Sequence, residues 1–253
     1  MGAKQRVLDS AFRAFDASWK IKNRARPRLL VYTDSRGMNV STANMARVKH
    51  HYGSHVDWLQ RRYLVDHVVC PYSHTTIVDF LNHLDTVDRA KYDAIVMECG
   101  IVEFSPRPPS NIAKVKQAKA GFPRFDEVFR ANAEHHAHPT GVPYLGEATT
   151  TLFSPEFTRR LAEELAGISN LVWVTSNRFV PGWDGNWKAR PADIDVTVEA
   201  LDEIVAGALD HVIDLREWTL PEVQRYTVDN VHFTKAGFGN LARRVDDSIQ
   251  RLV

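Results

Sequence analysis

A serine and a histidine–acid pair stand near opposite ends of the chain. Ser35 lies in the string DSRG, directly after the apolar run LLVY at 29–32. Asp229 precedes His232 by three residues, and no other Asp-x-x-His occurs in the sequence. A serine hydroxyl becomes a nucleophile when an imidazole removes its proton and an acid holds that imidazole in place. The three residues therefore predict nucleophilic catalysis, provided that the fold brings them together.

The elements that must position these residues are strands and helices in alternation. Helical patterns separate most of the apolar runs, and Ser154 and Thr234 are typical caps of two of these helices. The alternation predicts parallel strands joined by right-handed crossovers, hence a three-layer α/β/α sandwich, flavodoxin-like, with a central parallel five-stranded sheet. Ser35 and His232 would then share the edge formed by the carboxyl ends of the strands. The predicted strands are Leu29–Thr33, Val65–Val69, Ala94–Met97, Leu171–Thr175 and Val212–Leu215.

Two segments lie outside this simple alternation. Apolar residues at helical spacing from Val7 to Trp19 predict an amphipathic helix, over about residues 5–20, docked on the domain. Residues 104–153 contain six prolines and only patchy helical pattern. We interpret them as a long insertion within one domain that spans residues 1–253. Such an insertion is either a lid or substrate-binding loop, or a simple surface excursion.

Composition excludes some classes of partner. The chain has 32 basic and 31 acidic residues, a net charge of +1, which gives no argument for nucleic acid or a membrane surface. No apolar run reaches the ~18 residues of a membrane span, and no signal peptide is indicated, so we expect a cytoplasmic protein. Cys70 and Cys99 are too few for a disulfide framework and are expected to be buried thiols.

The two chemical motifs carry a resemblance to a known family. Asp34-Ser35 after the first strand and Asp229-x-x-His232 before the last helix resemble the first and fifth blocks of the SGNH (GDSL-like) hydrolase superfamily, over nearly the whole chain. The resemblance implies the SGNH-type fold. It also implies that Ser35 attacks an acyl carbonyl, that His232 acts as general base and then general acid, and that Asp229 orients the imidazole.

The other two blocks of that family are altered here. The third block, Gly-x-Asn-Asp, corresponds to Gly100-Ile101-Val102-Glu103, so the glycine and an acid are kept and the asparagine is not. Loss of such an oxyanion donor typically costs about 2.7 to 4 kcal/mol in barrier. The second block reads CPYSHTT at 70–76 and has no glycine, although a backbone amide at Ser73 or His74 could still donate.

The string GIVEFSPRP at 100–108 also resembles a branch of SGNH-like proteins that we associate with bacterial surface-glycan gene clusters. We therefore expect a small-molecule or glycan substrate. Arg36 and Arg107 would place positive charge near the crevice and favour an acidic substrate, or else they form ion pairs. We expect Asp34 to fix the turn and Asn177 to line the crevice. Trp183 and Trp187 are either an aromatic platform for a sugar or base, or a cover for the sheet edge.

Two histidine clusters invite comparison with metal sites. The string EHHAH at 134–138 has adjacent histidines in a predicted loop, and His51 and His55 have helical spacing without the acid of a metalloprotease motif. Neither cluster has the spacing of a closed metal site, so no metal is predicted.

Three hypotheses on function follow. The first is a serine esterase or O-acyltransferase that acts on an ester-linked acyl group, most plausibly acetyl, of a carbohydrate. It would need no cofactor, and acetyl-CoA would be the donor if it is a transferase. The second is a catalytically degenerate protein that binds a glycan, nucleotide or partner in the same crevice. The third is different chemistry there, with Glu103 as the base.

Overall fold

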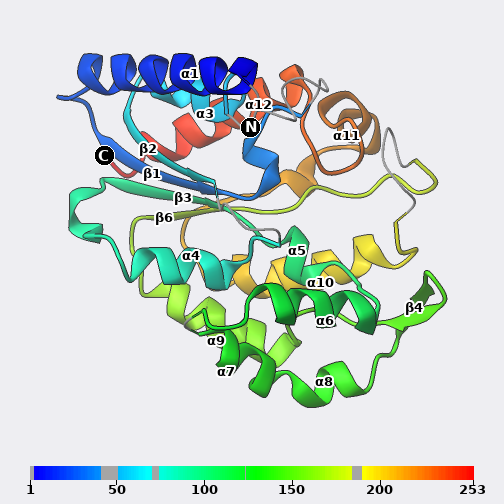
Figure 1. Ribbon diagram of the computed structural model, residues 1–253. Coiled ribbons are helices and arrows are strands. Elements are labelled where there is room, and N and C mark those ends of the chain that lie inside the picture. Colours follow the sequence, from blue (N-terminus) through cyan, green and yellow to red (C-terminus); the bar gives the residue numbers. More distant parts are fainter. Residues whose placement is uncertain (1–2, 41–50, 70–73, 123, 184–189) are drawn as a thin grey trace.

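The structure is a computed structural model that describes residues 3–40, 51–69, 74–122, 124–183 and 190–253, and the side chains from residue 10 onward. Figure 1 shows a sheet between two layers of helices. The strands are β1 (Arg28–Thr33), β2 (Leu64–Val69), β3 (Ala94–Glu98), β4 (Gly141–Tyr144), β5 (Glu147–Thr149), β6 (Leu171–Val174) and β7 (Val212–Ile213). The helices are α1 (Ala3–Lys22), α3 (His55–Gln60), α4 (Ile77–Leu84), α5 (Ile101–Phe104), α6 (Pro109–Ala118), α7 (Phe125–Ala131), α8 (Ala133–Ala137), α9 (Pro155–Ala166), α10 (Ile194–Ala206), α11 (Leu220–Tyr226) and α12 (Lys235–Ile249).

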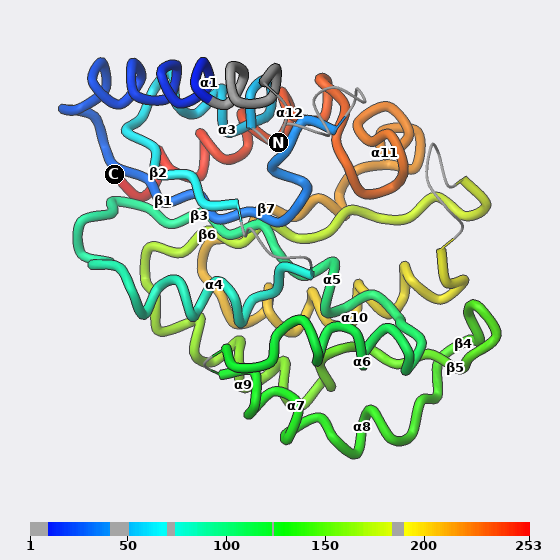
Figure 2. Tube along the Cα trace, in the orientation of Figure 1, coloured from blue at the N-terminus to red at the C-terminus, as the bar shows by residue number. Residues whose placement is uncertain are grey.

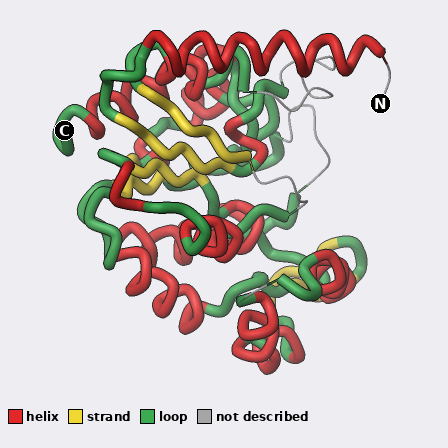
Figure 3. The backbone as a smooth tube through the Cα atoms, turned by 60° about the vertical axis from the view of Figure 1, so that its left-hand side comes forward, coloured by secondary structure: helices red, strands yellow, loops and turns green. Residues whose placement is uncertain are grey.

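The central sheet has five parallel strands in the order β2-β1-β3-β6-β7. Each predicted strand is present, with ends that differ by one or two residues. The predicted α/β class and the parallel five-stranded sheet are therefore confirmed. The view in Figure 3 shows this sheet between helices, with the small β4–β5 hairpin apart from it.

Alternate residues of the strands pack on opposite faces of the sheet, as the pleat requires. On one face Leu30 and Met97 join the cluster formed with α4, α9 and α10. On the other face Leu29 and Val96 join the cluster formed with α3 and α12. Because both faces are covered, the inner strands β1, β3 and β6 are largely apolar runs, whereas the edge strand β2 carries Asp66 and His67.

Capping residues set the ends of the helices that flank the site. The hydroxyl of Ser154 accepts from the amide of Phe157 at 3.2 Å, and that of Thr234 accepts from Gly237 at 3.2 Å. These caps confirm the predicted starts of α9 and α12. The cap residue Thr234 lies two residues after His232, so the start of α12 is fixed close to this histidine.

The predicted N-terminal helix is present as α1, which lies along the outside of the α3 layer (Figure 1). It contacts α3 and β2, and Lys20 pairs with Asp66 of β2 at 2.7 Å. Among the described helices, none combines the length and the apolarity that crossing a membrane requires.

Residues 104–153 form α6, α7, α8 and the β4–β5 hairpin, of which α7 and α8 lie farthest from the sheet (Figure 2). Phe125, Val128 and Phe153 from this segment are buried in the cluster that covers one face of the sheet. The segment is therefore more than a surface excursion, because it supplies part of the core. Its role as a lid or substrate-binding region stays a prediction.

Candidate active site

Ser35 begins a turn of 3-10 helix at the carboxyl end of β1. The amide of Asp34 donates to the carbonyl of Glu98 at the end of β3, at 2.9 Å. The carboxylate of Asp34 then accepts from the amide of Arg36 at 2.8 Å, which closes the turn around Ser35. The prediction that Asp34 fixes the turn is confirmed, and the apolar run ends where the chain leaves the sheet after Thr33.

The loop before α12 brings His232 to Ser35. The Ser35 Oγ and His232 Nε2 are 3.0 Å apart, although 197 positions separate the two residues. On the other side of the ring, His232 Nδ1 and Asp229 Oδ2 are 2.7 Å apart. Hydroxyl, imidazole and carboxylate thus form one hydrogen-bonded chain, which is the arrangement that activates a serine.

Asp229 is held by main-chain donors as well as by the ring. Its Oδ1 accepts from the amides of Val231 at 3.0 Å and His232 at 2.7 Å. Burial alone would raise the pKa of Asp229, but the hydrogen bond and charge of His232, together with these amides, hold it below its ordinary value. The carboxylate therefore stays ionised at neutral pH and can stabilise a protonated His232.

Arg36 does not offer its charge to the crevice. Its side chain is 1% exposed and pairs with Asp34, while Nη2 donates to the carbonyl of Cys99 at 2.6 Å and Nη1 to that of Thr175 at 3.3 Å. The guanidinium thus ties the ends of β1, β3 and β6 together. The expectation that Arg36 binds substrate is corrected: its donors are taken up by the protein, as the ion-pair alternative required.

Gly100 begins α5 directly after β3. Its φ is +108°, and a Cβ there would lie 3.2 Å from the ring of Phe104 and 3.3 Å from that of Trp173. Only glycine suits this backbone and this space. The amides of Gly100 and Ser35 make no hydrogen bond to the described residues, so both remain available as oxyanion donors.

Glu103 is completely buried beneath the second-block loop. Its Oε1 accepts from the amide of Ile77, the first residue of α4, at 2.7 Å. Burial raises the pKa of Glu103 to about 8. The side chain thus anchors the loop after β2 to the loop after β3, and its position in the core does not favour a role as a base toward substrate.

The second-block loop is described only in part. Ser73 and Cys70 lie outside the described residues, and His74 has a φ of +64°. Burial and the charges of Arg107 and Lys119 lower the pKa of His74. Ser73 as a donor stays a prediction, and Cys99 is buried with a free thiol, as expected.

Asn177 follows β6 and lies beside the triad loop. It is 2% exposed, and its Nδ2 donates to the carbonyls of Arg178 at 2.7 Å and Asn230 at 2.9 Å. Since its donors hold the Asp229–His232 loop, Asn177 supports the site. Its role in lining the crevice stays a prediction.

Two further arginines lie at the site, and the sequence pointed to only one of them. Arg107 Nε donates to the carbonyl of Val102 at 2.7 Å. Arg190 Nη2 lies 3.7 Å from Asp229 Oδ2 and 3.5 Å from the carbonyl oxygen of the same residue. Arg190 was missed because no motif surrounds it. The only available signal was its place in the loop that follows β6.

His135 and His136 lie in helix α8, not in the predicted loop. His135 Nε2 lies 2.9 Å from the hydroxyl of Thr151, and His136 Nε2 lies 2.9 Å from the carbonyl oxygen of Leu152. His55 is buried beside Glu98. In the described ranges, no group of three or more His, Cys, Asp or Glu side chains is arranged to hold a metal ion. Trp183 packs on the core next to α12, which corresponds to the covering alternative, and Trp187 lies outside the described residues.

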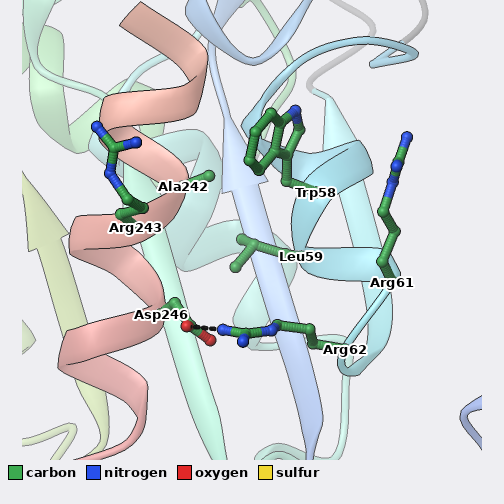
Figure 4. Close-up of a pocket in the computed structure, with 7 residues that line it drawn as sticks. All are labelled: Trp58, Leu59, Arg61, Arg62, Ala242, Arg243 and Asp246. Carbon is green, nitrogen blue, oxygen red and sulfur yellow. Dashed lines mark hydrogen bonds and ion pairs between the residues drawn. The ribbon is translucent and has the colours of Figure 1, made fainter.

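A separate pocket lies between α3 and α12 (Figure 4). Trp58 and Arg62 line it, and Arg62 pairs there with Asp246 of α12. Ser35, Asp229 and His232 do not line this pocket, so it is not the candidate active site.

Comparisons with known proteins place the fold. No known family model matches the chain, and no curated protein matches its sequence. A lipase/acylhydrolase from Enterococcus faecalis has a similar structure, with a TM-score of 0.54 and 15% identity over 90% of this chain and 97% of that one. An acetyl xylan esterase gives a TM-score of 0.47 and 12% identity over 87% of this chain and 98% of that one. An esterase from Pseudoalteromonas gives a TM-score of 0.44 and 13% identity, over 88% and 97%.

The fold is therefore α/β with a central parallel five-stranded sheet, SGNH-hydrolase-like. The expected fold type is confirmed. The lipase/acylhydrolase shares this fold at low sequence identity.

Proposed function

We propose that this protein is a serine esterase or O-acyltransferase that cleaves or transfers an ester-linked acyl group, most plausibly acetyl, of a carbohydrate. The observation that supports the proposal most directly is the 3.0 Å separation between Ser35 Oγ and His232 Nε2, with Asp229 on the other ring nitrogen. No metal or redox cofactor is needed for this chemistry.

In the proposed mechanism His232 Nε2 takes the proton of Ser35 as Oγ forms a bond to the acyl carbon. The carbonyl oxygen becomes an oxyanion, which the amides of Ser35 and Gly100 stabilise by hydrogen bonds. The bond from the acyl carbon to the sugar oxygen then breaks, and that oxygen takes the proton from His232. The acyl group is left on Ser35.

The second half repeats these steps with a new nucleophile. His232 removes a proton from water, or from an acceptor hydroxyl in a transferase, as its oxygen attacks the acyl carbon. The bond to Ser35 Oγ breaks, and the hydroxyl recovers the proton. Hydrolysis and transfer share the acyl-enzyme, so this geometry supports both.

Val102 makes the oxyanion site weaker than the family pattern implies. A side-chain amide at this position would add a third donor, and its absence typically costs about 2.7 to 4 kcal/mol. We therefore expect a slow esterase on simple esters, with binding of the correct substrate contributing a large part of the rate.

The test is acetate release from a panel of acetylated sugars, with and without acetyl-CoA, by the wild type, Ser35→Ala and Glu103→Gln. Activity that Ser35→Ala abolishes and Glu103→Gln retains would support the proposal. The reverse pattern would reject it in favour of a reaction that uses Glu103.

A further inference from the structure

We propose that Arg107 and Arg190 form an anion-binding subsite beside the triad, so that the preferred acyl ester is carried by a sugar with a carboxylate or phosphate. This inference rests on the proposed function, and it assigns the feature of the substrate that the site recognises.

Arg107 lies among the loops of the site. Its Nε donates to Val102 of the third block at 2.7 Å, and its backbone pairs with that of Thr150 through bonds of 2.7 and 2.9 Å. The charge of Arg107 lowers the pKa of His74 in the second-block loop, so His74 also lies near Arg107. Arg107 is thus held where the loops that follow β2 and β3 meet.

Arg190 reaches the site from the loop that follows β6. It lies 3.7 Å from Asp229 Oδ2, which links it to the loop that carries His232. Burial lowers the pKa of Arg107 to about 10. The positive charge of Arg190 also lowers this pKa, whereas Glu103 raises it. The two guanidinium groups are therefore close enough for the charge of Arg190 to act on Arg107.

No acid of the described ranges balances the charge of Arg107. Among the described residues, no carboxylate lies within ion-pair distance of its guanidinium, and its one side-chain hydrogen bond is made by Nε. Glu103, the acid whose charge would favour a protonated Arg107, has a pKa raised to about 8 by burial and is mostly neutral at pH 7. Asp229 lies beside Arg190, but no carboxylate that the structure describes pairs with Arg107, and an anionic ligand would supply that counter-charge.

Guanidinium groups bind carboxylates and phosphates through paired, charge-assisted hydrogen bonds. In the described part of the chain neither Nη atom of Arg107 makes a hydrogen bond, so both could serve such a ligand, while Nε donates to Val102. The sugar of an acyl ester at Ser35 would carry its anionic group toward this junction. Arg36, the other arginine beside the nucleophile, is excluded because the protein takes up its donors.

The experiment compares three acetylated substrates that differ at one carbon: an acetylated methyl glucoside, the corresponding methyl glucuronide and the corresponding 6-phosphate. We expect wild-type kcat/KM to be about 10- to 100-fold higher for at least one anionic substrate. Preference for the glucuronide or for the phosphate identifies the source of the charge. Arg107→Gln and Arg190→Gln should bring the ratio of anionic to neutral substrate close to one, and Arg107→Lys should restore part of it.

Arg160→Gln is the matched control, because Arg160 is exposed and pairs with Glu127 on the surface. It should keep the wild-type ratio. A wild-type ratio near one, or a ratio unchanged in both variants, overturns the proposal. An equal loss on neutral and anionic substrates also overturns it, because that pattern belongs to an oxyanion donor or to a structural residue.

If no acetyl ester is turned over, the proposed function fails and the subsite is judged by binding alone. Calorimetry with methyl glucuronide, glucose 6-phosphate and methyl glucoside measures it on the intact chain. Binding of an anionic sugar that Arg107→Gln weakens at least 10-fold supports the subsite independently of catalysis. Equal or absent binding of all three sugars rejects it.

Discussion

Arg36 Nη2 donates a 2.6 Å hydrogen bond to the carbonyl oxygen of Cys99, so the residue after Ser35 holds the residue before Gly100. One buried guanidinium thereby sets the separation of the two amides, of Ser35 and Gly100, that the proposed mechanism places on the oxyanion.

Arg36→Gln should destabilise the fold strongly, because it leaves the buried carboxylate of Asp34 without its counter-charge. Breaking a buried pair in this way typically costs about 3 to 5 kcal/mol. Urea unfolding at pH 7 measures the loss. Arg160→Gln breaks an exposed pair and should cost less than about 1 kcal/mol. Equal stability of the two variants would show that Arg36 does not hold the strand ends together.

Gly100→Ala should lower both stability and kcat. Its φ of +108° is unfavourable for alanine, and the added Cβ would lie 3.2 Å from the Phe104 ring. We expect a loss of about 1 to 3 kcal/mol in the free energy of unfolding. Gly146→Ala is the control, since Gly146 also has a positive φ, +84°, but no atom within 4 Å of the new Cβ. A loss no larger than that of the control would contradict the close packing around Gly100.

Glu103→Gln should flatten the pH dependence of stability. Burial raises the pKa of Glu103 from 4.5 to about 8, so between these values the folded state holds a proton that the unfolded state has released. The contribution of this group to stability is present below about pH 4.5 and is lost as the pH rises through 8. Glutamine keeps an acceptor for the Ile77 amide and does not titrate.

One pKa unit corresponds to about 1.4 kcal/mol, so the variant should lose about 1 to 3 kcal/mol less than the wild type between pH 5 and pH 8. Urea unfolding at the two pH values measures this difference. Some decline should remain, because burial also raises the pKa of Glu98 to about 8 and that of Asp202 to about 7. An unchanged slope in the variant would mean that Glu103 is charged in the folded protein.

Asp229→Asn should lower kcat by about 10³- to 10⁴-fold while the fold is retained. The new carbonyl oxygen can still accept from the amides of Val231 and His232, as Oδ1 does now. The NH₂ group then faces His232 Nδ1 and donates to it, which moves the ring proton to Nε2, where it cannot accept from Ser35. Initial rates of aryl acetate hydrolysis measure the effect. Asp247→Asn, on the exposed side of α12, should leave kcat unchanged.

The sequence predicted the parts of the molecule that depend on local pattern. Both faces of the inner strands are buried, so β1, β3 and β6 are largely apolar runs, and capping residues such as Ser154 and Thr234 precede their helices. Ser35 and His232 could be paired from sequence because the carboxyl ends of parallel strands share an edge.

The parts that sequence could not predict depend on long-range packing. A buried arginine and a partly exposed one look alike in sequence, and only the fold shows that Arg36 is enclosed while Arg190 reaches Asp229. The prolines of residues 104–153 suggested a loop. In the structure Phe125 and Phe153 of this segment are buried in the core cluster, so the segment packs against the rest of the domain.

The central claim is that Ser35 is an activated nucleophile, and labelling with a fluorophosphonate tests it most directly. Intact mass and peptide mapping compare the wild type with Ser35→Ala and His232→Ala. The account predicts one adduct, on Ser35, that is absent in the first variant and strongly reduced in the second. No adduct on the wild type under conditions that label a control serine hydrolase, or an adduct that survives Ser35→Ala, would contradict it.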